Sequence, residues 1–482
     1  MQDPINSANE NYLQHLISLP SACSIRVEKD ILLASRECLF AAGKELDLQA
    51  LYRLRGKTLI QPLSLNLSIA EAFDAASLTA SVESYLQADP VLLELFEQSD
   101  IKPLVRQGCG MVCDYSSLRQ CLWLMQKCYP NEFERGLFCA VFTAALYRRK
   151  GYEDKNIINA FFAALVHDIA YLFIKPLSQR SNEELKPQEW QQLCLHPELA
   201  YELLSFLPLL PSTISRAVLE HHEEVDGSGY PSGKLAKQLA PLGRMIHLLD
   251  SVHAIYTTHF RPRARTLHDL VPIVQMNQMS RPGMPAADLI SFLRLGSVTS
   301  SCSVPEELMP LFITQVKERH SYIRDFVQQA ETFIEQNQMS IANAKLFALS
   351  RMLDHICVSM NQSGLINDAY MRWLDQVMVH KLDHAYREVE DAFLMMQEVL
   401  YHIQGFILRM QSIVEEQNPP VTNLTPIWAP DRSLSLIEGS ASVVGAHEST
   451  KKALENFERK SVPPLPGELK NLWVSKVRKI GP

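Results

Sequence analysis

Apolar side chains recur at helical spacing almost throughout residues 115–300, and this periodicity most constrains what the chain can fold into. An apolar residue at every third or fourth position gives a segment one buried helical face, whereas a half-buried strand needs a period of two. Proline and glycine interrupt the pattern at Tyr129-Pro130, Gly151, Pro176, Pro211 and Asp226–Pro231. The helices expected between these breaks are Ser117–Cys128, Glu132–Lys150, Asp154–Phe173, Pro187–Phe206, Pro211–Glu220 and Pro241–Thr258. No run of alternating β-branched residues appears, so residues 115–300 are predicted to be all-α.

A small mixed α/β module is expected over residues 20–110, before the helical domain. Its predicted strands are Asp30–Ala34, Cys38–Ala41 and Thr58–Pro62, and its predicted helix carries Leu46, Leu48, Leu51 and Leu54. Nothing in this module has the spacing of a catalytic site, so we interpret it as regulatory. Residues 1–19 begin with a polar stretch that contains acidic side chains, and they are expected to form a disordered N-terminus.

A second helical bundle is expected over residues 303–417, with three long helices at Glu306–Gln338, Ile341–Asn361 and Ala369–Gln417. An apolar stripe in the last helix is typical of a bundle core, and a dimerising helical stalk is the alternative. The sequence therefore permits either a monomer or a homodimer. Residues 418–482 are predicted to be a flexible linker followed by a basic amphipathic tail at Glu468–Ile480, which is either a docking peptide or a frayed end.

Composition excludes several classes of protein. Hydrophobic residues make up 47% of the 482 residues and charged residues 21%, which is ordinary for a globular protein and excludes global disorder. With 46 basic and 54 acidic residues, the chain has no electrostatic reason to bind a nucleic acid polymer. The longest uncharged apolar runs, Leu137–Tyr147 and Ile157–Val166, are too short to span a membrane. Ten cysteines without a C-x-x-C pair are typical of reduced thiols, so a soluble, cytoplasmic protein is predicted.

A histidine and an aspartate are adjacent at His167-Asp168, at the end of an intensely apolar predicted helix. Burying both side chains is costly unless each has a partner. A divalent metal ion is a natural partner, because a neutral imidazole nitrogen and a carboxylate oxygen both bind transition metals. A His-Asp pair alone is a weak signal for such a site.

Further ligand-type residues follow His167-Asp168 at similar intervals. His196 lies 29 residues after His167, His221 lies 25 residues after His196, and Asp250 lies 28 residues after His222. Each interval fits one helix and one connection, so each residue can return to the same end of a helical bundle. The pair His221-His222 precedes a tight Asp-Gly-Ser-Gly-Tyr-Pro turn, a combination that is rare by chance. The spacing therefore indicates one clustered metal site.

On these residues the sequence resembles the HD-GYP family, a branch of the HD phosphohydrolase superfamily of bacterial phosphodiesterases that hydrolyse cyclic di-GMP. His167 and Asp168 match the H-D step of the family pattern, and His196 matches its His-Pro histidine. Residues 221–231 match the name-giving pattern H-H-E-x-x-D-G-x-G-Y-P in full, and Asp250 matches a late aspartate. The resemblance covers about residues 125–300. It implies a mainly α protein with an HD-type helical bundle between the N-terminal module and the C-terminal bundle.

The resemblance also implies a cofactor and a set of site residues. Two divalent transition metals, iron or manganese, would be held by His167, His196, His221, His222 and Asp250, with Asp168 bridging them. Such a pair lowers the pKa of a bound water and clamps the attacking and leaving oxygens of a phosphodiester. The implied catalytic residues are Asp168, His167 and, at the place of a family lysine, Tyr171. Asp226, Gly227, Gly229, Tyr230 and Pro231 would shape the site, and Arg261 and Arg263 would contact phosphate. In the family, the loop that carries the Gly-Tyr-Pro motif, here residues 226–231, is also implicated in binding GGDEF cyclase domains.

The sequence departs from the family pattern in its first half. An upstream family histidine falls at Arg135, or at Glu134 if the turn at Gly151 is one residue shorter. Arginine cannot ligate a metal because it stays protonated, whereas glutamate can. The H-D-x-G-K step ends in Ala170-Tyr171, so both the glycine and the lysine are missing. The second half of the ligand set is complete and the first half is damaged, so the site is expected to hold two metals or, if degenerate, one.

Two classes of function follow from these observations. The first is an active phosphodiesterase that hydrolyses cyclic di-GMP to pGpG and GMP in second-messenger signalling. The second is a degenerate HD-GYP module that serves as a cyclic di-GMP sensor or a GGDEF-binding adaptor without turnover. An HD-type phosphohydrolase with a different phosphoester substrate is a third alternative. The retained histidines favour the first class, and Arg135 and Tyr171 favour the second.

Overall fold

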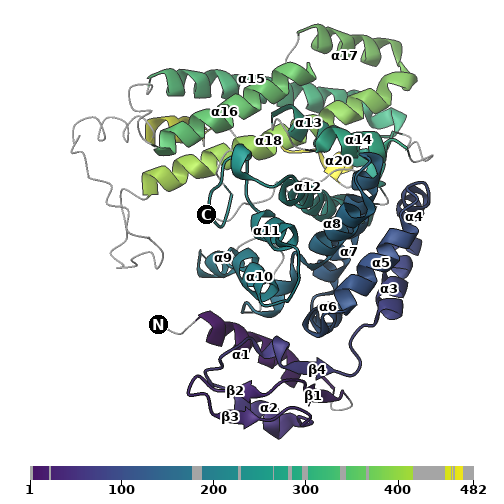
Figure 1. The fold of residues 1–482 in the computed structure, drawn as a ribbon. Coiled ribbons are helices and arrows are strands. Elements are labelled where there is room, and N and C mark those ends of the chain that lie inside the picture. The colour runs from purple at the N-terminus through teal and green to yellow at the C-terminus, as the bar shows by residue number, and fades with distance from the viewer. Residues whose placement is uncertain are drawn as a thin grey trace. The chain divides into compact units, whose positions relative to one another are not determined.

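The computed structural model describes most of the chain, and it divides that chain into two compact units. The described residues are 4–20, 23–175, 187–225, 229–263, 265–280, 285–295, 302–336, 344–364, 368–415, 451–457, 459 and 462–470. Unit 1 comprises Met1–Val271 and Gly283–Thr299, and unit 2 comprises Pro272–Pro282 and Ser300–Pro482. Both units consist mainly of helices, as Figure 1 shows, and the predicted mainly α fold is confirmed.

The mixed module at the start of unit 1 contains two small antiparallel sheets. Strand β1 (Ile25–Val27) pairs with β4 (Leu67–Ile69), and β2 (Ile31–Leu32) pairs with β3 (Cys38–Phe40). Helix α2 (Leu48–Leu54) begins at Asp47, whose carboxylate accepts a hydrogen bond from the amide of Ala50 at 2.7 Å. The strand predicted over Thr58–Pro62 is reduced to one isolated bridge between Leu33 and Leu59.

The expectation of a disordered N-terminus is wrong for Pro4–Ile17, which form helix α1. The side chains of Tyr12, Leu13 and Leu16 lie on one helical face and are at most 2% exposed. The ring of Tyr12 stacks on Phe173 at 5.0 Å, and the Asn11 amide donates to the Phe173 carbonyl at 3.0 Å. Burying three large apolar side chains offsets the ordering of a short polar helix, which the polar composition alone did not reveal.

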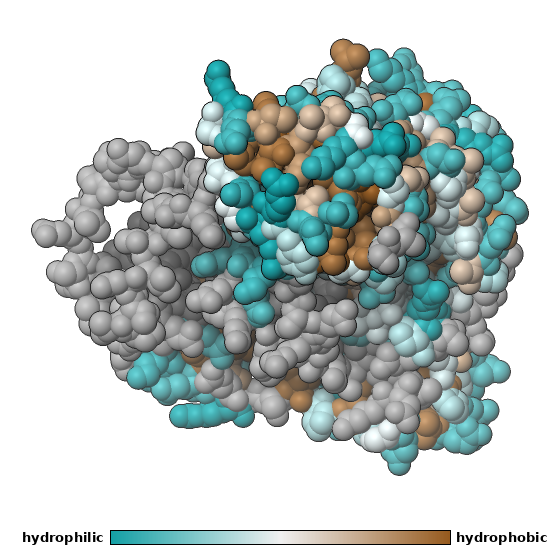
Figure 2. All heavy atoms as spheres, turned by 90° about the horizontal axis from the view of Figure 1, so that it is seen from below, coloured by the Kyte–Doolittle hydropathy of each residue, from teal (hydrophilic) through white to brown (hydrophobic). Residues whose placement is uncertain are grey.

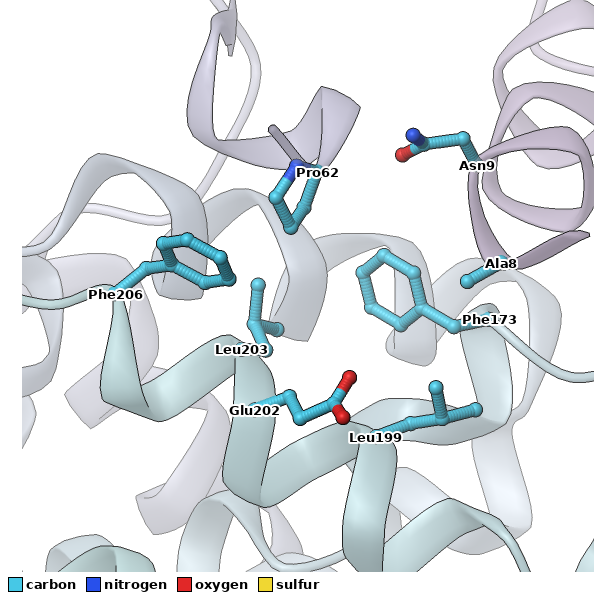
Figure 3. A pocket seen from close by; sticks show the side chains of 8 residues that line it. All are labelled: Ala8, Asn9, Pro62, Phe173, Leu199, Glu202, Leu203 and Phe206. Atoms are coloured by element: carbon cyan, nitrogen blue, oxygen red, sulfur yellow. The ribbon is translucent and has the colours of Figure 1, made fainter. Parts of the chain in front are cut away.

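A small hollow lies beside this contact, where α1 approaches the segment that follows His167-Asp168. Phe173 and Leu203 point into it, with Asn9 and Pro62 on the opposite side (Figure 3). The Asn9 side chain accepts a hydrogen bond from the Leu63 amide at 2.7 Å, so part of its polarity is already satisfied. The lining contains neither histidine nor aspartate, and the hollow is therefore separate from the predicted metal site.

The stability of helix α1 is expected to depend on pH through the protonation of His15, which is buried beside the ring of Tyr129. Burial lowers the pKa of His15 below its usual value, so below about pH 6.5 the unfolded chain binds more protons than the folded one. Stability is therefore present above pH 6.5 and is lost as the pH falls, by at most about 1.4 kcal/mol per pH unit from this residue. Hydrogen exchange of residues 4–17 should rise between pH 7 and pH 5.5, after correction for the intrinsic exchange rate.

The matched control for this prediction is His15→Gln, which keeps a polar side chain but cannot titrate. Its corrected exchange over residues 4–17 should vary less with pH than that of the unchanged protein. Equal pH dependence in the two proteins would show that His15 does not govern the stability of α1.

A set of helices in unit 1 carries the predicted site residues. Before the site come α3 (Ala75–Gln87), α4 (Pro90–Glu97), α5 (Lys102–Cys113) and α6 (Ser116–Cys128). The site itself is built on α7 (Pro130–Arg149), α8 (Asp154–Val166), α9 (Pro187–Leu193), α10 (His196–Ser205), α11 (Ser212–Glu220) and α12 (Pro241–Ile255). Helix α14 (Ala286–Leu293) completes unit 1.

Helices α7 and α8 pack together along their lengths and form the centre of unit 1 (Figure 1). Their apolar residues are almost all buried, as the periodicity predicts. Gly136 permits a close approach of the two backbones, because a Cβ atom there would lie 2.9 Å from the Leu165 carbonyl oxygen. This contact brings Arg135 to the level of His167 and Asp168.

Three predicted helices are interrupted at places that the periodicity did not indicate. Helix α8 stops at Val166 and is followed by a 3₁₀ turn, η2 (Ile169–Leu172). The predicted helix over Pro187–Phe206 is divided into α9 and α10, and α12 passes into a π-helical turn, η4 (Tyr256–Phe260). Two of these interruptions place ligand-type residues at helix ends, since His167 follows α8 and His196 begins α10.

Unit 2 contains a helical bundle made of α13 (Val271–Ser280), α15 (Met309–Gln336), α16 (Ala344–Ser363), α17 (Asp368–His380) and α18 (Tyr386–Glu415). The single helix predicted over Ala369–Gln417 is therefore wrong. Lys381 has a positive φ of 47° and breaks the helix between α17 and α18, although neither glycine nor proline marks this place. The predicted apolar stripe lies in α18, where Phe393 and Phe406 are fully buried against Phe312 and Phe326.

The flexible linker predicted over residues 418–466 is wrong for its later part. Residues 451–457 are helical, and Phe457 packs against Phe326 with ring centroids 4.8 Å apart. Arg319 donates to the Pro463 carbonyl at 2.8 Å, and Leu469 in α20 (Gly467–Lys470) is fully buried. These apolar side chains anchor the segment within unit 2. Residues 416–450, and the predicted tail beyond Lys470, lie outside the described residues.

Further features of the described residues concern membrane spans, cysteine thiols and exposed apolar side chains. Among the residues that the structure describes, no helix is both long enough and apolar enough to cross a membrane. All ten cysteines are free thiols. Apolar side chains such as Leu48 and Tyr52 in the N-terminal module are nevertheless exposed, and hydrophobic patches lie among hydrophilic residues on the face shown in Figure 2. The regulatory role of this module stays a prediction.

Candidate metal centre

The predicted site residues meet in the interior of unit 1. His167 and Asp168 follow α8, His196 begins α10, His221 and His222 follow α11, and Asp250 lies in α12. His167, His196 and His221 are fully buried, and Asp168 is 3% exposed. The regular sequence intervals therefore return these side chains to one place, as the spacing indicated.

Hydrogen bonds to the backbone fix the orientation of three histidine rings. The Nδ1 atoms of His167, His196 and His221 lie 2.7, 2.7 and 2.5 Å from the carbonyl oxygens of Ala164, Leu193 and Val218. A carbonyl oxygen can only accept, so each Nδ1 carries the proton and each Nε2 presents a lone pair. Histidines that bind metals are held in this way, by donating the proton of the other ring nitrogen.

The three Nε2 lone pairs converge on the carboxylate of Asp168. The Nε2 atoms of His196 and His221 lie 3.4 and 3.6 Å from its Oδ1, and that of His167 lies 3.4 Å from its Oδ2. His196 and His221 bring their Nε2 atoms within 3.1 Å of each other. Lone pairs so close together repel, and neither Asp168 oxygen has a hydrogen-bond partner among the described residues. This buried arrangement fits a cation between the ligands.

The described residues contain two overlapping groups of ligand atoms, each with all members within 4.8 Å of one another. The first group is Asp168, His196, His221 and His222, and the second is His167, Asp168 and Asp250. The first supplies three imidazoles and one carboxylate, a ligand set suited to a divalent transition metal. Asp168 belongs to both groups, and the bridging role that the family resemblance implies for it stays a prediction.

The guanidinium of Arg135 lies beside two carboxylates of the second group, those of Asp168 and Asp250. Its Nε lies 3.0 Å from Asp168 Oδ2, and its Nη1 lies 3.2 Å from Asp250 Oδ1. Glu134, the other residue considered for the upstream position, has a 43% exposed side chain that lies 3.7 Å from Arg261. The hypothesis that Glu134 is a metal ligand is therefore wrong, because neighbouring residues on a helix point in directions about 100° apart.

The charge states of the site follow from burial and from Arg135. Burial lowers the pKa of His167, His196 and His222, so these imidazoles are neutral at pH 7 and able to ligate. Burial alone would raise the pKa of Asp168 and of Asp250, but Arg135 and the surrounding histidines together outweigh it and hold both pKa values below their usual range. The site therefore presents anionic carboxylates and neutral histidines.

Tyr171 lies in η2 beside the first ligand group, at the place of the family lysine. Its ring centroid is 5.2 Å from the ring of His196 and 5.8 Å from the Arg135 guanidinium. Burial raises the pKa of Tyr171 well above its usual value, so the hydroxyl stays protonated. It can donate a hydrogen bond to an anionic ligand, but it cannot replace the positive charge of a lysine.

The segment after His222 is held by carboxylates whose role the sequence did not reveal. Glu223 accepts hydrogen bonds from the amides of Ser232 and Lys234 at 2.6 and 2.8 Å. Glu220, which no motif singled out, accepts from the Ala240 amide at 2.6 Å and from the Lys234 ammonium at 2.9 Å. Both glutamates are nearly fully buried, so they organise the connection between α11 and α12.

Gly229 and Tyr230 shape the same connection. A Cβ atom on Gly229 would lie 2.2 Å from the Glu224 nitrogen and 2.5 Å from the His222 oxygen, so a larger residue would displace the loop. The ring of Tyr230 stacks on His222 at 4.8 Å and contributes to the position of that ligand. Pro231 follows in the described part of the loop, whereas Asp226 and Gly227 lie outside the described residues.

The predicted phosphate-binding arginines lie after α12, in the short turn η5 (Arg261–Arg263). Arg261 is half-exposed and pairs with Glu134, and it does not enter either ligand group. The side chain of Arg263 lies outside the described residues. A contact of these arginines with phosphate stays a prediction.

Replacing Glu223 with alanine is expected to loosen this loop, because it leaves the amides of Ser232 and Lys234 without their buried acceptor. The expected loss is about 1–3 kcal/mol of unfolding free energy. Limited proteolysis should cleave residues 224–235 faster in the variant, and the thermal unfolding midpoint should fall. Glu153→Ala, which removes an exposed carboxylate that makes no cap hydrogen bond, is the control. Unchanged cleavage of Glu223→Ala would contradict a structural role for this carboxylate.

Part of the chain is similar in sequence to known proteins. Residues 129–282 match the family model described as HD domain. Over 116 residues the chain is 28% identical to cyclic di-GMP phosphodiesterase PdeB of Borreliella burgdorferi. The matched segment covers 24% of this chain and 30% of that protein. It is 29% identical over 116 residues to the 3′3′-cGAMP-specific phosphodiesterase 3 of Vibrio cholerae, covering 24% of this chain and 25% of that protein. A solved HDG"Y"P protein from Bdellovibrio bacteriovorus is similar at 14% identity, with a TM-score of 0.31 over 56% of this chain and 95% of that one.

The helices and the buried ligand set define an HD domain of the HD phosphohydrolase superfamily over residues 129–282. The pattern that runs from His167-Asp168 to Asp250 is similar to that of the HD-GYP branch of this superfamily. The matched segments span less than a third of the length of these curated relatives.

Proposed function

We propose that the protein is a metal-dependent phosphodiesterase that hydrolyses cyclic di-GMP to pGpG and GMP. The observation that carries this proposal is the convergence of the Nε2 lone pairs of His196 and His221 on Asp168, in a buried site where the described residues place no arginine or lysine on that side. The named activities of the similar proteins from Borreliella burgdorferi and Vibrio cholerae support a cyclic dinucleotide as the substrate class.

In this proposal the chain's own residues hold and orient the reacting groups. Asp168, His196, His221 and His222 would hold a divalent transition metal such as iron or manganese. Such a metal, when bound, polarises a phosphodiester and lowers the pKa of a water molecule. The backbone carbonyls behind the histidines keep the lone pairs directed inward, and Tyr230 supports His222. Tyr171 offers a hydroxyl to a phosphate oxygen at the place of the missing lysine.

A second candidate function is binding of the cyclic dinucleotide, or of a GGDEF domain, without turnover. The observation that favours it is Arg135, whose guanidinium pairs with Asp168 and Asp250 in the half of the site that the family resemblance assigns to another metal. Tyr171 in place of a lysine also removes a positive charge from the reacting centre. Such a module would report the concentration of the nucleotide rather than lower it.

One pair of measurements separates the two functions. The purified full chain is incubated with cyclic di-GMP, and in parallel with 3′3′-cGAMP, in the presence of Mn²⁺ or Fe²⁺, and the products are resolved by chromatography. Appearance of pGpG and GMP, abolished in Asp168→Ala, supports the phosphodiesterase. Saturable binding by calorimetry without product supports the sensor and overturns the enzyme. If neither product formation nor binding is observed, both functions are overturned for these nucleotides.

A further inference from the structure

We propose that the guanidinium of Arg135 is a built-in cation that takes the place of one of the two metals, so the site binds a single metal ion. This inference rests on the metal site of the proposed function, but it does not depend on turnover. It assigns a role to a residue that departs from the family pattern.

The two oxygens of Asp168 face different partners. Oδ2 lies 3.0 Å from Arg135 Nε and 3.4 Å from His167 Nε2. Oδ1 lies 3.4 and 3.6 Å from the Nε2 atoms of His196 and His221, on the side where no arginine or lysine contact is found among the described residues. The carboxylate therefore separates a half that already contains a cation from a half that contains only ligands.

Arg135 satisfies the charge of the occupied half. The carboxylates of Asp168 and Asp250 are both nearly fully buried, and one guanidinium contacts both of them. Two buried like charges repel strongly unless a cation lies close to both. The guanidinium of Arg135 lies 3.0 and 3.2 Å from carboxylate oxygens that a metal in this half would need, and its permanent charge repels a second cation.

The surroundings of Arg135 keep it in this place. Its side chain is only 18% exposed, and its guanidinium carbon lies 5.8 Å from the ring centroid of Tyr171. The neighbouring Gly136 sets the close contact of α7 with the Leu165 carbonyl, so the backbone of Arg135 cannot easily move away. Arg135 and Tyr171, which replace the histidine and the lysine of the family pattern, thus lie near each other.

Counting bound metal tests the inference without measuring activity. The full chain is stripped, reconstituted with Mn²⁺ under anaerobic conditions and desalted, and manganese per chain is measured by mass spectrometry. About one ion is expected for the unchanged protein and for Arg135→Lys, and about two for Arg135→His, because the imidazole restores a ligand and removes the charge. Circular dichroism and the thermal midpoint confirm that each variant folds.

Electron paramagnetic resonance of the unchanged protein gives a second readout, independent of any variant. An uncoupled six-line manganese signal is expected from one isolated ion, whereas an exchange-coupled spectrum would show two adjacent ions and overturn the inference. One ion in Arg135→His would overturn the role of Arg135 as the substitute cation. If the protein is active and its spectrum shows a coupled pair of ions, the single-metal inference fails and the proposed phosphodiesterase stands. If one ion is bound and no nucleotide is cleaved, the phosphodiesterase fails and the single-metal inference stands.

Discussion

Replacing Asp168 with asparagine is expected to abolish stable metal binding and to lower turnover of the cyclic dinucleotide by at least about 100-fold. The reason is that Asp168 is the one residue shared by both ligand groups, with three histidine Nε2 atoms within 3.6 Å of its oxygens. Losing an outer partner of a metal ligand typically costs about 10–100-fold in affinity or activity, and losing the central carboxylate should cost more. Asparagine keeps the size of the side chain, so the effect reports its charge.

Metal content by mass spectrometry and product formation by chromatography check this prediction together. Asp154→Asn is the matched control, since Asp154 begins the same helix α8 but its side chain is 64% exposed. The control should retain both metal and activity. An Asp168→Asn protein that is folded and still binds metal as the unchanged protein does would rule out the proposed ligand set.

Replacing Arg135 with methionine is expected to destabilise unit 1 in the absence of metal, by about 3–5 kcal/mol. Methionine preserves much of the side-chain volume, so the main loss is the cation between the buried carboxylates of Asp168 and Asp250. Their uncompensated charges must then be desolvated together or take up a proton. Addition of Mn²⁺ should recover more stability in Arg135→Met than in the unchanged protein, because the ion can now enter the vacated half of the site.

Thermal and urea unfolding, each with and without Mn²⁺, measure this effect. Arg148→Met is the control on the same helix, because Arg148 is 40% exposed and, within the described part of the chain, its ion-pair partners are the exposed Asp100 and Asp154. Exposed pairs contribute at most about 1 kcal/mol, so the control should change little. Equal losses in the two variants would show that Arg135 does not neutralise a buried pair of carboxylates.

Much of the fold and of the site could be predicted from periodicity and spacing. The 3.6-residue apolar period predicted the helices of unit 1, because a helix must bury one face whatever its neighbours are. The intervals between His167, His196, His221 and Asp250 predicted that these residues meet, since each interval spans one helix and one return. Helix ends were less predictable. The break at Lys381 carries no glycine or proline, and η2 interrupts an apolar run that reads as one helix.

Some buried side chains could not be paired with their contact partners from the sequence, because nothing in their residue type indicated burial. The polar composition of residues 4–17 concealed the burial of Tyr12 against Phe173, which lies 161 positions further along the chain. Glu220 and Glu223 looked like ordinary charged residues beside a motif, and their partners are backbone amides up to 20 positions away. Contacts of this kind depend on which segments pack together, and no local pattern encodes that.

The sequence by itself determined that this chain is helical, because periodicity is a local property, and its spaced histidines and aspartates resemble the pattern of the HD-GYP family. Only the tertiary structure decided between Glu134 and Arg135, since a shift of one residue turns a side chain by about 100° around the helix. It placed the guanidinium between Asp168 and Asp250 and left Glu134 at the surface. The packing of the helices therefore decides that a cation, the guanidinium of Arg135, lies among the ligands where another ligand could have been.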